Sequence, residues 1–195
     1  DAGVAAGLAS NVVQVDMANF GGIAPILIRE SRSNTAWSVA GVGRWSKSAT
    51  LEKMLERHGG KLPLDGAPAI VPGAPAAWIA ALSRFGTMSF EEVVRPALEL
   101  ARDGFLIDQS LQTSLEITGK NFRRWPTSSD IYRPNDVPLQ VGDRLKQPAL
   151  ARLLQRLVEA EKNSSGDRTA KLSAVHRAFY TGDVARIIAN WVNAH

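Results

Sequence analysis

The chain has 195 residues, of which 45% are hydrophobic and 22% charged, which is typical of a folded domain and not of a disordered chain. Its formal net charge of +4 comes from 23 basic and 19 acidic residues spread along the sequence, so no dense basic block indicates a nucleic-acid partner. The absence of cysteine excludes disulfides, thiolate metal sites and a cysteine nucleophile. No apolar run approaches the roughly 20 residues that span a bilayer, so we expect no membrane partner.

A helix and two strands are predicted first along the chain. Residues 2–13 are mostly Ala, Gly, Leu and Val, which predicts a helix that other elements cover on most of its surface. Two short runs rich in branched apolar residues, 23–28 and 37–42, predict neighbouring strands. The polar segment 29–35 lies between them, and we expect the two strands to pair in antiparallel fashion.

Helices are predicted over much of the remaining chain. Ser89 has acidic residues directly after it and is the expected N-cap of one helix, while Gly86 and Gly104 are expected helix stops. The segments with helical spacing are 51–58, 76–85, 89–103, 147–161 and a final stretch from about 172 onward, interrupted near 180–183.

Two segments are predicted to lack regular structure. The stretch 61–75 forms an extended connector because it is rich in proline, and its last proline can open the next helix. Residues 123–144 are rich in Pro, Asp and Ser and hold no regular period, which predicts a surface loop with a turn at Val141-Gly-Asp. The prolines of the connector are Pro63, Pro68, Pro72 and Pro75.

Motifs for metal and nucleotide chemistry are weak. His58, His176 and His195 lie far apart and none has a second ligand at short spacing, so we expect no metal site. Gly41-Val-Gly43 and Gly59-Gly60 lack the other residues of dinucleotide- and phosphate-binding motifs. No cofactor is therefore expected.

Hydroxyl and aromatic residues have mostly structural interpretations. Ser46, Ser48 and Thr50 precede the helix predicted at 51–58, and no Gly-x-Ser-x-Gly string surrounds them, so capping explains them better than nucleophilic catalysis. Trp45 directly follows Arg44 and is a candidate for the wall of a pocket. Core or interface packing is expected for Trp37, Trp78, Trp125 and Trp191.

Several strings, taken together, resemble the large subunit of the γ-glutamyltranspeptidase family of N-terminal-nucleophile hydrolases. The most specific is 84–105, because it matches many Pro, Gly and aromatic positions in one run. In chain order, the strings are Asp1-Ala-Gly-Val-Ala-Ala-Gly-Leu-Ala, Phe20-Gly-Gly, Ile70-Val-Pro-Gly-Ala-Pro-Ala-Ala-Trp, residues 84–105, Val141-Gly-Asp-Arg-Leu-Lys-Gln-Pro-Ala-Leu-Ala and Phe179-Tyr-Thr-Gly-Asp-Val-Ala.

The resemblance implies an α+β fold, the four-layer αββα sandwich of N-terminal-nucleophile hydrolases, of which this chain is a mostly helical part with a few strands. Residues 1–195 are expected to be part of the large subunit, incomplete at both ends, because the sequence starts without Met and both ends lie in helical patterns. In the family, a precursor cuts itself, and the new N-terminal Thr of the small subunit attacks a γ-glutamyl amide. We expect no catalytic residue in this chain, no activity of the chain alone, and no metal or organic cofactor. The expected partners are that small subunit and a small-molecule amide.

The candidate substrate-binding residues are Arg44 and Trp45. Arg44 follows the second predicted strand, where the family typically carries an Arg that binds the substrate's α-carboxylate, and a planar guanidinium suits two parallel hydrogen bonds to a carboxylate. A solvated loop arginine is the alternative. The family usually has an acidic residue next and Ala-Pro soon after, whereas here the chain reads Trp45-Ser-Lys-Ser.

These altered neighbours leave the acyl group open between γ-glutamyl, cephalosporin-acylase-like and small oxo-amide substrates. A non-catalytic helical binding module is the second hypothesis. The compartment, periplasmic or cytoplasmic, also stays open.

Overall fold

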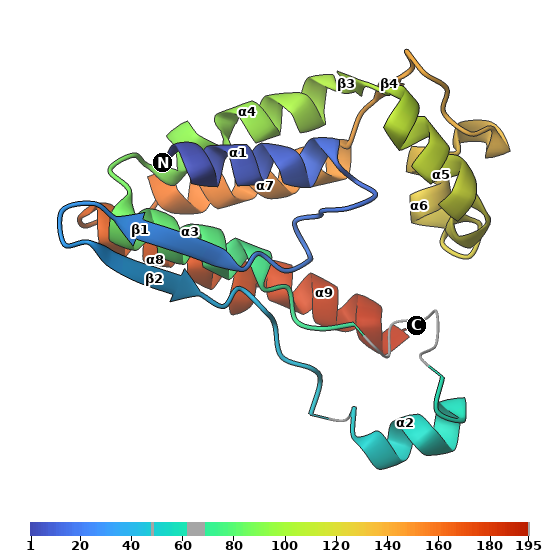
Figure 1. Cartoon of the computed structure of the whole chain (residues 1–195), viewed down its shortest axis with the longest axis horizontal. Coiled ribbons are helices and arrows are strands. Elements are labelled where there is room, and N and C mark those ends of the chain that lie inside the picture. Colours follow the sequence, from blue (N-terminus) through green and yellow to red (C-terminus); the bar gives the residue numbers. More distant parts are fainter. Residues whose placement is uncertain (48, 62–68, 195) are drawn as a thin grey trace. The chain divides into compact units, whose positions relative to one another are not determined.

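The computed structural model describes residues 1–47, 49–61 and 69–194, and Figure 1 shows that these are mainly helices with two small sheets. The chain divides into two compact units, each made of two segments that are distant in sequence. Unit 1 contains residues 1–19 and 88–163, and unit 2 contains residues 20–87 and 164–195. Within the described residues, no helix has both the length and the apolar character needed to cross a membrane.

Unit 1 is built around three helices, α1 (Ala2–Val13), α4 (Phe90–Asp103) and α7 (Pro148–Lys162). α4 packs on both α1 and α7, as Figure 1 shows. The buried residues of α1 include Val4, Leu8 and Val12, which recur every four residues and therefore share one face. The predicted helix at 2–13 is confirmed, but Ala2, Gly3 and Ala6 are exposed, so its coverage is less complete than expected.

The start of α4 is capped twice. Ser89 and Glu92 form a capping box, in which the Ser89 side chain accepts from the Glu92 amide and Glu92 accepts from the Ser89 amide. The buried carboxylate of Glu161, on α7, accepts hydrogen bonds from the amides of Phe90 (2.7 Å) and Glu91 (2.8 Å). Because the first amides of a helix have no partner inside it, this carboxylate ties α7 to α4.

The rest of unit 1 corrects the sequence prediction. Residues 123–144 were expected to form only a surface loop, but they contain α6 (Pro126–Tyr132) and a 3-10 helix, η1 (Pro134–Asp136). The Asp136 carboxylate pairs with Arg123 (2.9 Å) and Arg133 (3.3 Å), which closes the segment on itself. The expected turn is present at residues 141–142. The remaining elements of unit 1 are β3 (Phe105–Leu106), α5 (Gln109–Phe122) and β4 (Arg144–Leu145), and α5 was not predicted.

Unit 2 opens with a β-hairpin. β1 (Ile26–Glu30) and β2 (Thr35–Val39) pair in antiparallel register, as expected, with Ile28 opposite Trp37. Both strands extend into the polar segment, because Asn34 adopts a left-handed conformation (φ 53°) that allows a tight turn. Trp37 packs against Phe85, and the guanidinium of Arg84 lies 4.0 Å from its ring centroid.

The helices of unit 2 are α2 (Leu51–His58), α3 (Ala74–Phe85), α8 (Arg168–Tyr180) and α9 (Asp183–Ala194). α3 packs on α8, and Arg168 donates to the carbonyls of Leu82 (3.1 Å) and Ser83 (2.9 Å) near the end of α3. The final helical segment begins at 168, earlier than predicted, and is interrupted at 181–182 as expected. Thr50 caps α2, whereas Ser48, Pro63 and Pro68 lie outside the described residues.

Candidate functional site

The backbone of Arg44 and Trp45 is held by the segment that leads into α3. Trp45 forms an antiparallel bridge with Ile70, and the amide of Val71 donates to the carbonyl of Arg44 at 2.9 Å. The Arg44 side chain is exposed, and no described residue hydrogen-bonds or pairs with its guanidinium. The structure therefore fixes the backbone at this position and leaves a cationic group open to a ligand or to solvent.

Three glycines let the backbone segments around Arg44 approach each other closely. A Cβ on Gly43 would lie 1.5 Å from the carbonyl oxygen of Val71, and one on Gly73 would lie 2.4 Å from that of Gly41. Gly41 has a positive φ of 56°, and its own Cβ would lie 2.0 Å from the carbonyl oxygen of Ala24. A side chain at any of the three would separate these segments. Gly41-Val-Gly43 thus has a packing role, which the sequence did not indicate.

The hydroxyl of a half-buried tyrosine fixes the other side of this backbone arrangement. Tyr180, the last residue of α8, donates to the carbonyl of Pro72 (2.6 Å) and accepts from the amide of Ala76 (3.0 Å). Partial burial raises the pKa of Tyr180 above its ordinary value, which already lies well above neutral pH, so the hydroxyl proton is in place to donate. His176 stacks on the Tyr180 ring with centroids 4.6 Å apart. Tyr180 was not singled out from the sequence, although it lies in one of the family-like strings.

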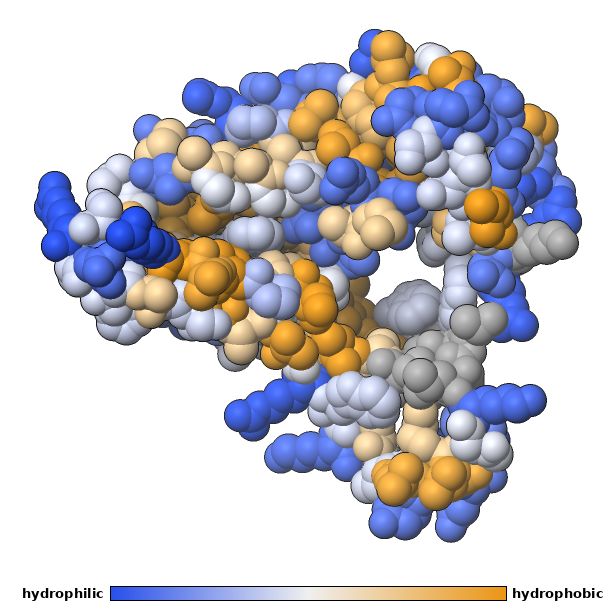
Figure 2. All heavy atoms as spheres, viewed as in Figure 1, coloured by the Kyte–Doolittle hydropathy of each residue, from blue (hydrophilic) through white to orange (hydrophobic). Residues whose placement is uncertain are grey.

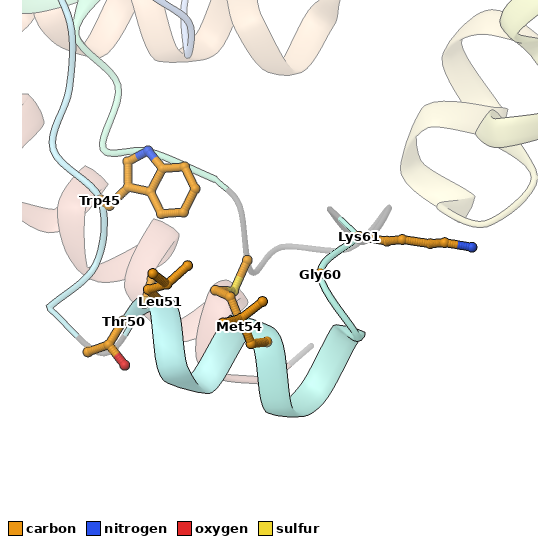
Figure 3. A pocket seen from close by; sticks show the side chains of 8 residues that line it. Trp45, Thr50, Leu51, Met54, Gly60 and Lys61 are labelled. Carbon is orange, nitrogen blue, oxygen red and sulfur yellow. The ribbon is translucent and has the colours of Figure 1, made fainter.

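A pocket of about 280 Å³ lies between Trp45 and α2 (Figure 3). Figure 3 shows Leu51 and Met54 pointing toward the Trp45 ring, while Lys61 points away. Trp45 thus lines a pocket wall, in contrast to Trp37 and Trp78, which pack within unit 2. The lining residues are Trp45, Ala49, Thr50, Leu51, Met54, Leu55, Gly60 and Lys61.

The remaining sequence candidates do not converge on a second site. His58 lies in the last turn of α2 and His176 on α8, while His195 lies outside the described residues. Within residues 1–47, 49–61 and 69–194, no group of His and acidic side chains is arranged to hold a metal ion. Trp191, which was expected to pack, is 42% exposed on α9.

Comparison with known proteins gives consistent matches along the chain. A family model described as Gamma-glutamyltranspeptidase matches residues 1–195. A glutathione hydrolase proenzyme of Escherichia coli is 32% identical over 164 residues, which cover 82% of this chain and 28% of that protein. An acylase ACY 1 proenzyme of a Pseudomonas species is 39% identical over 97 residues, which cover 49% of this chain and 17% of that protein.

The fold also matches solved structures. A crystal structure of Helicobacter pylori gamma-glutamyltranspeptidase superposes with a TM-score of 0.81 and 25% identity, covering 95% of this chain and 50% of that one. The prediction of an α+β N-terminal-nucleophile hydrolase fold, with this chain as a mostly helical part, is confirmed. The chain spans about a third or less of the length of the curated relatives it matches.

Proposed function

Because the chain belongs to the γ-glutamyltranspeptidase family, we propose that it is the large-subunit part of an enzyme that hydrolyses or transfers a γ-glutamyl or related acyl amide. The observation that carries this proposal is the family match over residues 1–195. The relatives from E. coli and Pseudomonas are both named proenzymes, which supports a precursor that is processed.

The proposed nucleophile is an N-terminal Thr that lies outside residues 1–195 and is freed when the precursor is cut. Its α-amino group takes the hydroxyl proton as the oxygen attacks the amide carbonyl, and returns a proton to the leaving amine. The acyl-enzyme ester then passes its acyl group to water or to a second amine, which regenerates the hydroxyl. The chain alone is therefore proposed to be inactive.

Arg44 is proposed to bind the carboxylate of the acyl part of the substrate. Its guanidinium is exposed and has no partner among the described residues, while its backbone is fixed by the bond from Val71 and by the bridge between Trp45 and Ile70. A cation on a fixed backbone can make two charge-assisted hydrogen bonds to a carboxylate. A solvated arginine would have no such effect on turnover.

The test uses the full-length parent protein with γ-glutamyl-4-nitroanilide and with 4-aminobutanoyl-4-nitroanilide, which lacks the α-carboxylate. Arg44→Ala should lower kcat/KM for the first substrate roughly 30- to 5,000-fold, which corresponds to a loss of about 2–5 kcal/mol of transition-state stabilisation. The same substitution should change kcat/KM for the second substrate much less, because that substrate has no carboxylate for Arg44 to bind. Arg32→Ala, an exposed arginine in the turn between β1 and β2, is the matched control.

Equal losses with both substrates would contradict the role of Arg44 in binding the carboxylate. Processing is tested separately, by mass spectrometry of the intact parent protein. Two fragments, of which the second begins with Thr, are expected. A single uncut chain without turnover would instead favour the non-catalytic binding module.

A second acyl class has one specific observation in its favour. The acylase relative is 39% identical over about half of this chain. Trp45 also stands where γ-glutamyltranspeptidases usually carry an acidic residue, and it lines an apolar pocket. An acylase acting on a less polar acyl group is therefore the alternative proposal, and the two 4-nitroanilides above would both be poor substrates for it.

A further inference from the structure

The apolar residues of α2 lie on one face that the described residues leave exposed. Leu51, Met54 and Leu55 are three and four residues apart, so they project from the same side of the helix. No residue of α2, all of which the structure describes, is buried, and Leu51 is 71% exposed. Figure 2 shows apolar atoms gathered over α2. Contiguous apolar patches on a protein surface are a mark of binding sites.

Trp45 faces this helix and turns the patch into a pocket. The pocket holds about 280 Å³, near the lower end of ligand-binding pockets, whereas a cavity of about 150 Å³ can already hold benzene. The described residues that line it include no carboxylate, and the side chain of Lys61 points away from the ring (Figure 3). The hydroxyl of Thr50 is engaged at 3.4 Å by the amide of Lys53. The described lining, mainly the side chains of Trp45, Leu51, Met54 and Leu55, therefore favours an apolar group.

The pocket also adjoins the proposed carboxylate site. Trp45 follows Arg44 directly, and consecutive Cα atoms are about 3.8 Å apart. The residue proposed to bind the carboxylate and the residue that forms the pocket wall are thus neighbours on one fixed stretch of backbone. A γ-glutamyl group is small and polar and would leave this pocket unfilled.

We propose that the pocket between Trp45 and α2 is a subsite for an aromatic or branched alkyl group of the amide substrate. This inference rests on the proposed function, since it places the group on the same substrate that Arg44 binds. The apolar group can belong to the acyl part or to the leaving amine, and the chemistry that recognises it is the same for both.

Binding is tested on the full-length protein without requiring turnover. The probes are 4-phenylbutanoate and butanoate, which share a carboxylate and differ by a phenyl ring, and their dissociation constants are measured by calorimetry or ligand-observed NMR. Burial of the ring should make 4-phenylbutanoate bind at least about tenfold more tightly. This ratio should fall to about twofold or less in Trp45→Ala and in Leu51→Ser, because both remove apolar surface from the pocket.

The matched control is Ile117→Ser on α5. The side chain of Ile117 is 75% exposed, a fraction similar to that of Leu51, and it does not line the pocket. The substitution removes the same kind of apolar surface elsewhere, so the ratio of the two dissociation constants should not change. The melting temperature of each variant confirms that it is folded. Equal binding of the two probes, as expected if another part of the parent protein covers α2, would overturn the subsite. A preference that survives both pocket substitutions would overturn it as well.

Two pairs of amides then decide which part of the substrate enters the pocket. Phenylacetyl- and acetyl-4-nitroanilide differ in the acyl part, and γ-glutamylanilide and γ-glutamylmethylamide differ in the leaving amine. The pair whose kcat/KM ratio is lowered by Leu51→Ser identifies the part concerned. If neither pair is turned over while the phenyl preference in binding persists, the proposed function fails, and the pocket stands only as an apolar binding site with no role in an amide substrate.

Discussion

Removal of one hydroxyl group, in Tyr180→Phe, should loosen the backbone that holds Arg44. The hydroxyl donates to the carbonyl of Pro72 at 2.6 Å and accepts from the amide of Ala76 at 3.0 Å. Phenylalanine keeps the ring and its packing but leaves both backbone groups without this partner. Each hydrogen bond is worth about 0.5–1.5 kcal/mol net, so the variant should lose about 1–3 kcal/mol of local stability.

The assay is hydrogen exchange of the Ala76 amide in the full-length protein. A loss of about 1–3 kcal/mol corresponds to roughly 5- to 150-fold faster exchange, since about 1.4 kcal/mol is a factor of ten. Tyr132→Phe is the control, because it deletes the same atom from a ring that packs on Phe122 with centroids 4.9 Å apart. The Tyr132 hydroxyl has no hydrogen-bond partner among the described residues.

Tyr180→Phe should also change the KM for substrate. Val71 donates to the carbonyl of Arg44, so a looser segment at Pro72 should raise KM for a carboxylate-bearing substrate in Tyr180→Phe and not in Tyr132→Phe. Unchanged exchange at Ala76, within about twofold, would show that the hydroxyl does not stabilise this turn, and the reasoning would be refuted.

Two further substitutions test the scaffold. Gly43→Ala should destabilise the full-length protein by about 1–3 kcal/mol or more, because the new Cβ would lie 1.5 Å from a carbonyl oxygen. Gly3→Ala, whose Cβ would have nothing within 4 Å, should instead stabilise α1 by about 0.5–1 kcal/mol. The melting temperatures of the two variants are compared, and equal effects would contradict the close approach at Gly43. Glu161→Gln should cost about 2 kcal/mol, since a buried carboxylate at the start of α4 is replaced by a neutral amide. The readout is faster exchange of the Phe90 amide, and exposed Glu159→Gln on the same helix should leave that exchange unchanged.

Local signals in the sequence predicted the elements that are stabilised locally. Ser89 and Gly104 mark the two ends of α4, and the structure places the cap and the stop at these residues. α5 and α6 were missed because they are rich in Ser, Thr and Asn, which have low helix propensity. They are stabilised instead by contacts distant in sequence. Leu111 and Leu115 of α5 share one buried cluster with Leu145, and Ile131 and Tyr132 of α6 pack against that cluster.

The site was also only partly predictable, because its contacts join residues that are distant in sequence. Trp45 was expected at a pocket wall and lines a pocket, while the substrate-binding roles of Arg44 and Trp45 stay predictions. Tyr180 acts on Pro72 across 108 residues of sequence, and no periodicity or short motif reports a contact of that range. The glycines around Arg44 matched no known motif because their role depends on which backbone segment lies opposite.

The order of synthesis adds a constraint on how this site is assembled. The ribosome delivers Arg44 and Pro72 well before Tyr180, and unit 2 is completed only by its second segment, residues 164–195. At about 5–20 residues per second, the Pro72 turn waits roughly 5–20 seconds for its hydroxyl partner. During that interval the nascent chain carries Arg44, the residue proposed to bind the substrate carboxylate, without the hydrogen bond that fixes its backbone. The proposed carboxylate site is therefore completed only late in synthesis.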